Sequence, residues 1–121
     1  MEKLQVGDRI KVSGGYDMDP PWLKGGSGYY AKVIGFFDSG IDKRKGGERL
    51  SASIEFEEEI EHKGFTGKYG FMLGRWEGHL WETSGIVHVH ISNVPINDSS
   101  DITKENSIWA ESHARYERVD S

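Results

Sequence analysis

The chain has 121 residues, a formal net charge of −5 and no cysteine. This length suits one domain with a core of its own, and we expect a single domain over residues 1–121. The missing cysteines exclude disulfides, thiolate metal sites and a thiol nucleophile. The acidic balance disfavours a protein that grips nucleic-acid phosphates, and no apolar run reaches the length of a membrane span. We therefore expect a cytoplasmic protein that binds neither nucleic acid nor a membrane.

The chain begins with the pattern of a short β-strand. Ile10 and Val12 alternate with Arg9 and Lys11, which predicts one buried face and one exposed face. A loop with paired glycines and paired prolines follows over residues 13–28, and loops of this length are usually functional or packed by their own side chains.

The next two segments predict longer strands. Residues 29–37 are apolar on both faces apart from Lys32, as in a central strand that is covered on each side. Gly35 interrupts this run, so we expect a bulge or a sharp bend there. Residues 50–56 alternate strictly between apolar and polar side chains, which is the clearest period of two in the sequence.

The second half of the chain mixes clear and ambiguous segments. Residues 57–70 carry an acidic run and then spaced glycines, which we interpret as an extension ending in a glycine-rich turn. Residues 71–81 predict a bulged strand or a wide hairpin. Residues 86–91 predict a strand that Pro95 ends, and a polar loop follows it. Residues 108–119 fit either a strand or a short C-terminal helix, and we favour the strand because apolar side chains alternate there.

These elements together predict an all-β domain, a small antiparallel and strongly bent barrel with long loops. The 16 glycines mark turns and bends, and the 12% of aromatic residues supply apolar area for the core. The interpretation depends on a closed or nearly closed sheet that turns one set of side chains inward, namely Leu50, Ala52, Ile54, Phe56, Val87, Val89 and Ile91.

The segments VGDRIKV and GYYAKVI, followed by the alternating third strand, resemble the SH3-like β-barrel superfold over residues 4–56. In such barrels a V-G-D-x-V-x-V strand commonly begins the sheet and a long first loop borders the ligand groove. The acidic-aromatic signature of proline-binding SH3 domains is approached here only by Tyr16 and Asp17. The whole chain is most similar to small bacterial proteins of uncharacterised function built on such barrels. This resemblance implies a fold and gives no information about an activity.

Large aromatic side chains are more numerous than one small barrel interior readily takes. An exposed surplus favours binding a peptide, a base or a sugar by stacking. In the alternative interpretation Trp76 and Trp81 cap the barrel ends and Trp22 packs under its own loop. The candidate binding surface combines the first loop with the region around residues 75–81, and its residues are Tyr16, Asp17, Trp22, Arg75, Trp76 and Trp81.

His88 and His90 are two apart on a predicted strand, so both imidazoles leave the same face. Such a pair can present two ligands to a divalent transition metal, as cupin-like barrels do, and the further ligands that a metal needs have four candidates: His62, His79, Glu82 and His113. The alternative, which we favour, is that both histidines simply lie on the more exposed sheet face. The carboxylates of residues 55–61 likewise fit a solvated strand edge better than a cation site.

We therefore expect a binding or interaction module that works through an aromatic-rich surface, without catalysis and without a cofactor. Its partner is a protein or a small ligand, and a homodimer is one version of this hypothesis. One alternative is a metal-binding, cupin-like protein or metal-dependent enzyme centred on His88 and His90. The other is an acidic inhibitor of a nucleic-acid-binding protein. Replacing Trp76 with alanine is expected to weaken binding or self-association with little loss of fold.

Overall fold

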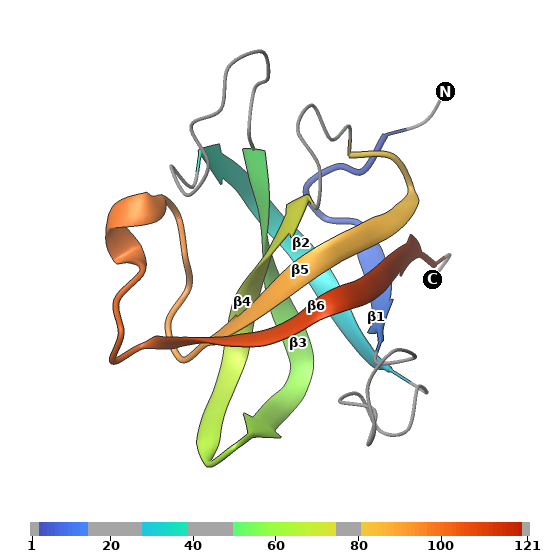
Figure 1. Ribbon diagram of the computed structural model, residues 1–121. Coiled ribbons are helices and arrows are strands. Elements are labelled where there is room, and N and C mark those ends of the chain that lie inside the picture. Colours follow the sequence, from blue (N-terminus) through green and yellow to red (C-terminus); the bar gives the residue numbers. More distant parts are fainter. Residues whose placement is uncertain (1–2, 15–27, 39–49, 75–80, 120–121) are drawn as a thin grey trace.

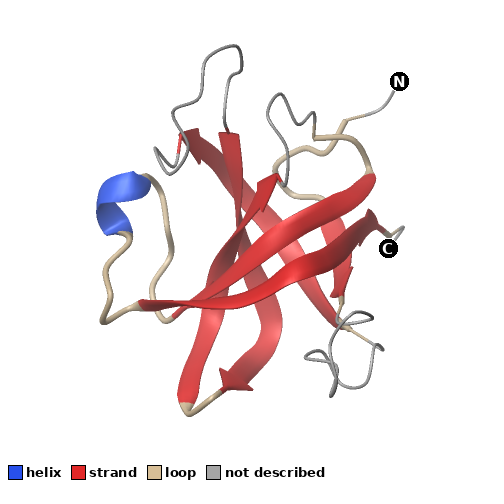
Figure 2. Ribbon diagram, viewed as in Figure 1, coloured by secondary structure: helices blue, strands red, loops and turns tan. Residues whose placement is uncertain are grey.

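The computed structural model describes residues 3–14, 28–38, 50–74 and 81–119 (Figure 1). Figure 2 shows that most of these residues lie in strands, with a single helical turn outside the sheet. In chain order the elements are β1 (Arg9–Ser13), β2 (Tyr29–Asp38), β3 (Leu50–His62), β4 (Phe65–Gly74), β5 (Ser84–Ser92), the 3-10 turn η2 (Ser99–Asp101) and β6 (Ser107–Arg118).

The six strands form a closed antiparallel barrel. Each strand pairs with the next one in sequence, and β1 also pairs with β6, where Ile10 lies opposite Arg118 and Val12 opposite Tyr116. In an open sheet, the outer backbone N–H and C=O groups of the first and last strands would lie unpaired at the edges. Closure of the barrel pairs these groups of β1 and β6 with each other. The all-β prediction is thereby confirmed. β6 (Ser107–Arg118) takes up all but the last residue of the segment 108–119, so the prediction of a strand is confirmed and the alternative of a C-terminal helix was wrong.

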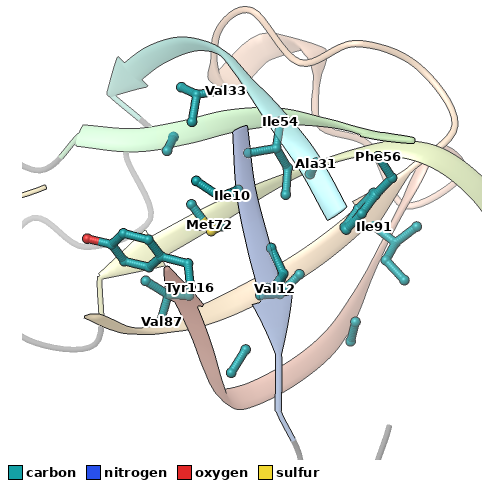
Figure 3. Close-up of a cluster of buried hydrophobic side chains, with 14 of the residues drawn as sticks. Ile10, Val12, Ala31, Val33, Ile54, Phe56, Met72, Val87, Ile91 and Tyr116 are labelled. Carbon is teal, nitrogen blue, oxygen red and sulfur yellow. The ribbon is translucent and has the colours of Figure 1, made fainter. Parts of the chain in front are cut away.

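The interior of the barrel holds the main hydrophobic core. Figure 3 shows side chains from every strand converging there, among them Ile10, Ile54 and Tyr116. The side chains predicted to point inward are buried in this cluster wherever the structure describes them, namely Ala52, Ile54, Phe56, Val87, Val89 and Ile91. The side chain of Leu50 lies outside the described residues. Period-two alternation was therefore a sound guide to the core.

Two irregularities bend the strands around this core. The register between β2 and β3 shifts between Val33 and Gly35, which confirms the predicted bulge. A larger shift lies on β3, where the chain from Glu55 to Ile60 pairs with only the stretch from Tyr69 to Gly67 on β4. The extra residues of β3 belong to the acidic run.

Beyond this shift β3 and β4 continue as a hairpin that projects from one end of the barrel (Figure 1). His62 lies opposite Phe65, so Lys63 and Gly64 form a two-residue turn. Both have positive φ, 51° and 84°, as a type I′ turn requires. Two-residue turns of this type match the twist of the flanking strands, and glycine takes the second position without strain.

Residues 93–106, which we call the strap, connect β5 to β6 outside the barrel (Figure 1, orange). Asp98 caps η2 by accepting a hydrogen bond from the backbone N–H of Ser100, and Asp101 accepts one in return from the backbone N–H of Asp98. The fully buried Ile96 of the strap packs with two ring side chains of the barrel's outer surface. We call this group of Phe37, Phe71, Ile96 and Ile102 the outer cluster.

Candidate functional site

One outer surface of the barrel gathers aromatic rings and imidazoles from three neighbouring strands. The register places Phe71 of β4 opposite His90 of β5, and His90 opposite Trp109 of β6. His88 projects from the same face of β5 because it lies two residues from His90. We call Phe71, His88, His90 and Trp109 the aromatic face.

The rings of the aromatic face touch in sequence. Phe71 and His90 stack, with ring centroids 4.5 Å apart and planes inclined by 8°. The indole of Trp109 meets His90 edge to face at 4.8 Å and lies 5.0 Å from the ring of His88. Stacked and edge-to-face contacts are both favourable, because an aromatic ring carries partial negative charge on its faces and partial positive charge at its edge. The run leads from the fully buried Phe71 to Trp109, whose side chain is 52% exposed.

The environment of His90 keeps its imidazole neutral. Burial, the larger cause, and repulsion from His88 together lower the pKa of His90 to about 4. The Nδ1 atom of His90 is buried and has no hydrogen-bond partner. A buried N–H without an acceptor is more costly than a buried lone pair, so the tautomer with its hydrogen on Nε2 is the favoured one.

That tautomer bears on the metal hypothesis. A histidine that binds metal through Nε2 carries its hydrogen on Nδ1 and almost always donates it to an acceptor. The Nδ1 of His90 has none. Within the ranges that the structure describes, no three histidine, aspartate or glutamate side chains are grouped to hold a metal ion.

The proposed further ligands are dispersed or lie beyond the described residues. His62 is at the tip of the β3–β4 hairpin, and Glu82 forms an isolated backbone bridge with Lys3. His79 and the side chain of His113 lie outside the described residues. Within the described part of the chain, the structure thus brings the two histidines together on one indole and groups no third ligand with them.

Most of the predicted binding surface lies outside the described residues, namely Tyr16, Asp17, Trp22, Arg75 and Trp76. Trp81 is described, and its side chain is only 7% exposed. It packs against Phe36 at 6.1 Å and Tyr116 at 5.5 Å between ring centroids, within the main core. Trp81 is therefore a core residue in the way that the alternative interpretation expected, and it does not belong to an exposed surface.

Tyr116 shows how the barrel accommodates a polar atom next to Trp81. Its hydroxyl donates a hydrogen bond of 2.9 Å to the backbone carbonyl oxygen of Glu82. Burial raises the pKa of Tyr116 well above its usual value, and the nearby Glu82 carboxylate adds to the effect. This phenol stays protonated and serves as a structural donor.

The acidic run of β3 has a basic counterpart on β1. The guanidinium of Arg9 donates two hydrogen bonds to the carboxylate of Glu57, at 2.7 and 3.0 Å, and lies 4.1 Å from the ring centroid of Tyr30. The hydrogen bond from Arg9 holds the pKa of Glu57 below its usual value. An exposed pair of this kind contributes little to stability. The predicted solvated strand edge is wrong as regards the edge, because β3 pairs with both β2 and β4, but Glu57, Glu58, Glu59 and Glu61 are exposed.

The sequence pattern did not identify Trp109 and Phe71 as partners of the histidines. Alternation within a strand gives the face of each residue, but the strand register decides which residues become neighbours. The register shifts twice between β5 and β6 just before His90 meets Trp109. The available signal was the pair of histidines opposite an apolar face, combined with the surplus of aromatic residues.

Comparison of the chain with models of known protein families, with curated proteins and with solved structures gives no match. Among the residues that the structure describes, no helix has both the length and the apolar character needed to cross a bilayer.

Proposed function

We propose that this protein is a binding module whose contact surface is centred on Trp109, with His88 and His90 beside it. The carrying observation is the half-exposed indole held against both imidazoles. Tryptophan is enriched at interface positions that dominate binding energy, because it offers a large contact area with few rotatable bonds. The imidazoles hold the indole in place, so little side-chain entropy is lost on binding.

The chemistry of the face favours a protein partner. His90 stays neutral at physiological pH, and its favoured tautomer directs an N–H donor away from the buried Nδ1. The indole N–H is a second donor, so the face suits backbone carbonyls beside an apolar side chain. The chain's charge of −5 weighs against nucleic acid as the partner.

The proposal extends to an SH3-like barrel, to self-association and to a cytoplasmic location. The closed barrel is compatible with the SH3-like superfold that residues 4–56 resemble, and loop-borne or face-borne binding is common on such scaffolds. A second copy of the chain is one possible protein partner. A cytoplasmic location stays a prediction from the cysteine-free composition.

The test compares Trp109→Ala with Tyr30→Ala. Both residues are exposed aromatics, but Tyr30 lies on β2 beneath Arg9, away from the aromatic face. Sedimentation velocity of the purified protein measures self-association, and affinity capture with the immobilised barrel supplies other partners, which are then purified and titrated. We expect Trp109→Ala to weaken the wild-type interaction by about thirtyfold or more, because interface tryptophans typically contribute at least about 2 kcal/mol. Tyr30→Ala should bind as the wild type does. Equal affinities of the wild type and Trp109→Ala would show that the interaction uses another surface.

A further inference from the structure

The strap forms its hydrogen bonds within itself. Its hydrogen bonds among the described residues all stay within residues 92–107, including Asn93 N–H to the carbonyl of Asn106 and Ser107 N–H to the carbonyl of Thr103. The amide of Asn106 also donates to the carbonyl of Asp101, across the strap. The strap is therefore an internally bonded unit that rests on the barrel through apolar side chains.

The apolar contact that the structure describes between strap and barrel consists of four side chains. Ile96 is fully buried and Ile102 is partly buried, and both pack on Phe37 and Phe71 in a cluster separate from the main core. Opening this contact exposes the outer cluster without breaking a hydrogen bond between strap and barrel. Small apolar contacts of this kind set the free energy of local opening well below that of global unfolding.

The rings of Phe37 and Phe71, on which the strap rests, meet edge to face at 5.6 Å across β3, above two buried serine hydroxyl groups. Ser51 lies between Phe37 and Leu73 in the strand register, and Ser53 lies between Gly35 and Phe71. Both serines are at most 2% exposed, and neither Oγ atom has a hydrogen-bond partner. A buried hydroxyl without a partner is penalised relative to one in water, so admitting water to this surface partly offsets the loss of the Ile96 contact.

We infer that the strap opens and closes as a unit over a second, normally covered face of the barrel, formed by Phe37 and Phe71 with Ser51 and Ser53 beneath their rings. Opening joins this face to the aromatic face, because Phe71 belongs to both and stacks directly on His90. The strap then controls how much aromatic surface the barrel presents. The inference rests on the packing of the strap and does not depend on what Trp109 binds.

The chain's lack of cysteine allows a direct test with single thiols. In Ser53→Cys the thiol lies on the covered outer face, and in Ala52→Cys it lies on the same strand but inside the barrel, where residue 52 is fully buried. The reagent is 5,5′-dithiobis(2-nitrobenzoate), applied at pH 8 without denaturant. If the strap opens, the thiol of Ser53→Cys reacts at least about a hundredfold faster than that of Ala52→Cys, whose reaction requires opening of the barrel itself.

Two further substitutions change the strap contact in opposite directions. Adding Ile96→Ala to Ser53→Cys should raise the labelling rate of the thiol about a hundredfold, because the main anchor of the strap is lost. The ratio of this rate to that of Ala52→Cys, measured in a protein that also carries Ile96→Ala, should increase as well. Adding Ser51→Ala should slow the labelling of Ser53→Cys about tenfold, because the closed state then carries one fewer unpartnered hydroxyl. Ser84→Ala, on an exposed position of β5, is the matched control and should leave the rate unchanged.

The result that overturns the inference is equal labelling of the two thiols, with both rates following the global unfolding free energy measured in urea. If either cysteine variant loses its fold by circular dichroism, the measurement is made with Ser51→Cys on the covered outer face, where residue 51 is fully buried, referenced to Val89→Cys in the core. The same rate comparison then decides the question.

Discussion

Substituting His90 with phenylalanine should remove much of the acid sensitivity of this fold. Phenylalanine keeps a ring that stacks on Phe71 at the position where the imidazole now lies, 4.5 Å away. It cannot take up a proton. The comparison therefore isolates the titration of one buried side chain, because all other ionisable groups are shared by the two proteins.

The sign and size follow from the two pKa values of His90. In the folded protein burial and His88 lower the pKa to about 4, against 6.5 for an unperturbed histidine. Well above pH 6.5 the imidazole is neutral in both the folded and the unfolded state and contributes no pH dependence. Between pH 6.5 and pH 4 the imidazole of His90 is protonated in the unfolded chain but stays neutral in the folded barrel, so the free energy of unfolding decreases as the pH falls. Integrating between these pKa values gives a loss of about 2 kcal/mol from pH 7 to pH 5.

The measurement is urea unfolding at pH 7 and pH 5, followed by circular dichroism for the wild type and for His90→Phe. The wild type should lose about 2 kcal/mol more than the variant over this interval, and the m-values should agree so that the comparison is valid. The same pH dependence in both proteins would show that His90 takes up its proton in the folded state near pH 6.5. The imidazole of His90 would then be open to water, in contradiction to its burial between Phe71 and Trp109.

Three further substitutions, one of them a control, test the backbone geometry of the barrel. Gly70→Ala should lower the free energy of urea unfolding by about 1–3 kcal/mol, because the added methyl group overlaps the backbone carbonyl oxygen of His90. Gly35→Ala is the control, since a methyl group added there meets no atom within 4 Å, and it should change this free energy by no more than about 1 kcal/mol. Equal losses in the two alanine variants would contradict the close approach of β4 and β5. Lys63→Asn should raise the thermal midpoint by a few degrees, since asparagine tolerates the left-handed conformation at φ 51° before Gly64 better than lysine does. A lower midpoint would mean that this turn is not of type I′.

The fold was predictable where alternation alone decides which side chains enter the core. Ala52, Ile54 and Phe56 on β3 are buried as the period of two required. Gly35 also marked its bulge correctly, because a glycine inside an apolar strand has few other roles. These inferences needed only local sequence and the rule that a sheet covers one face.

The parts that were missed depend on contacts between distant segments. The Lys63–Gly64 turn was not recognised, because lysine before glycine is a weaker turn signal than asparagine before glycine. Trp81 was assigned to a surface because its burial depends on Tyr116, which is far away in the chain and meets it only in the closed barrel. Trp109 gained its role through register shifts that no pattern within β5 or β6 reports.

The pairing of β1 with β6 has a consequence for how this protein is made. All other strand pairs join sequence neighbours and can form soon after each leaves the ribosome, but the β1–β6 seam needs the last strand. Until Ser107–Arg118 is synthesised, the nascent sheet has two edge strands with unpaired backbone groups, Arg9–Ser13 and Ser84–Ser92. The interval before that final strand arrives is when a chaperone, or another nascent chain, has the best opportunity to engage it.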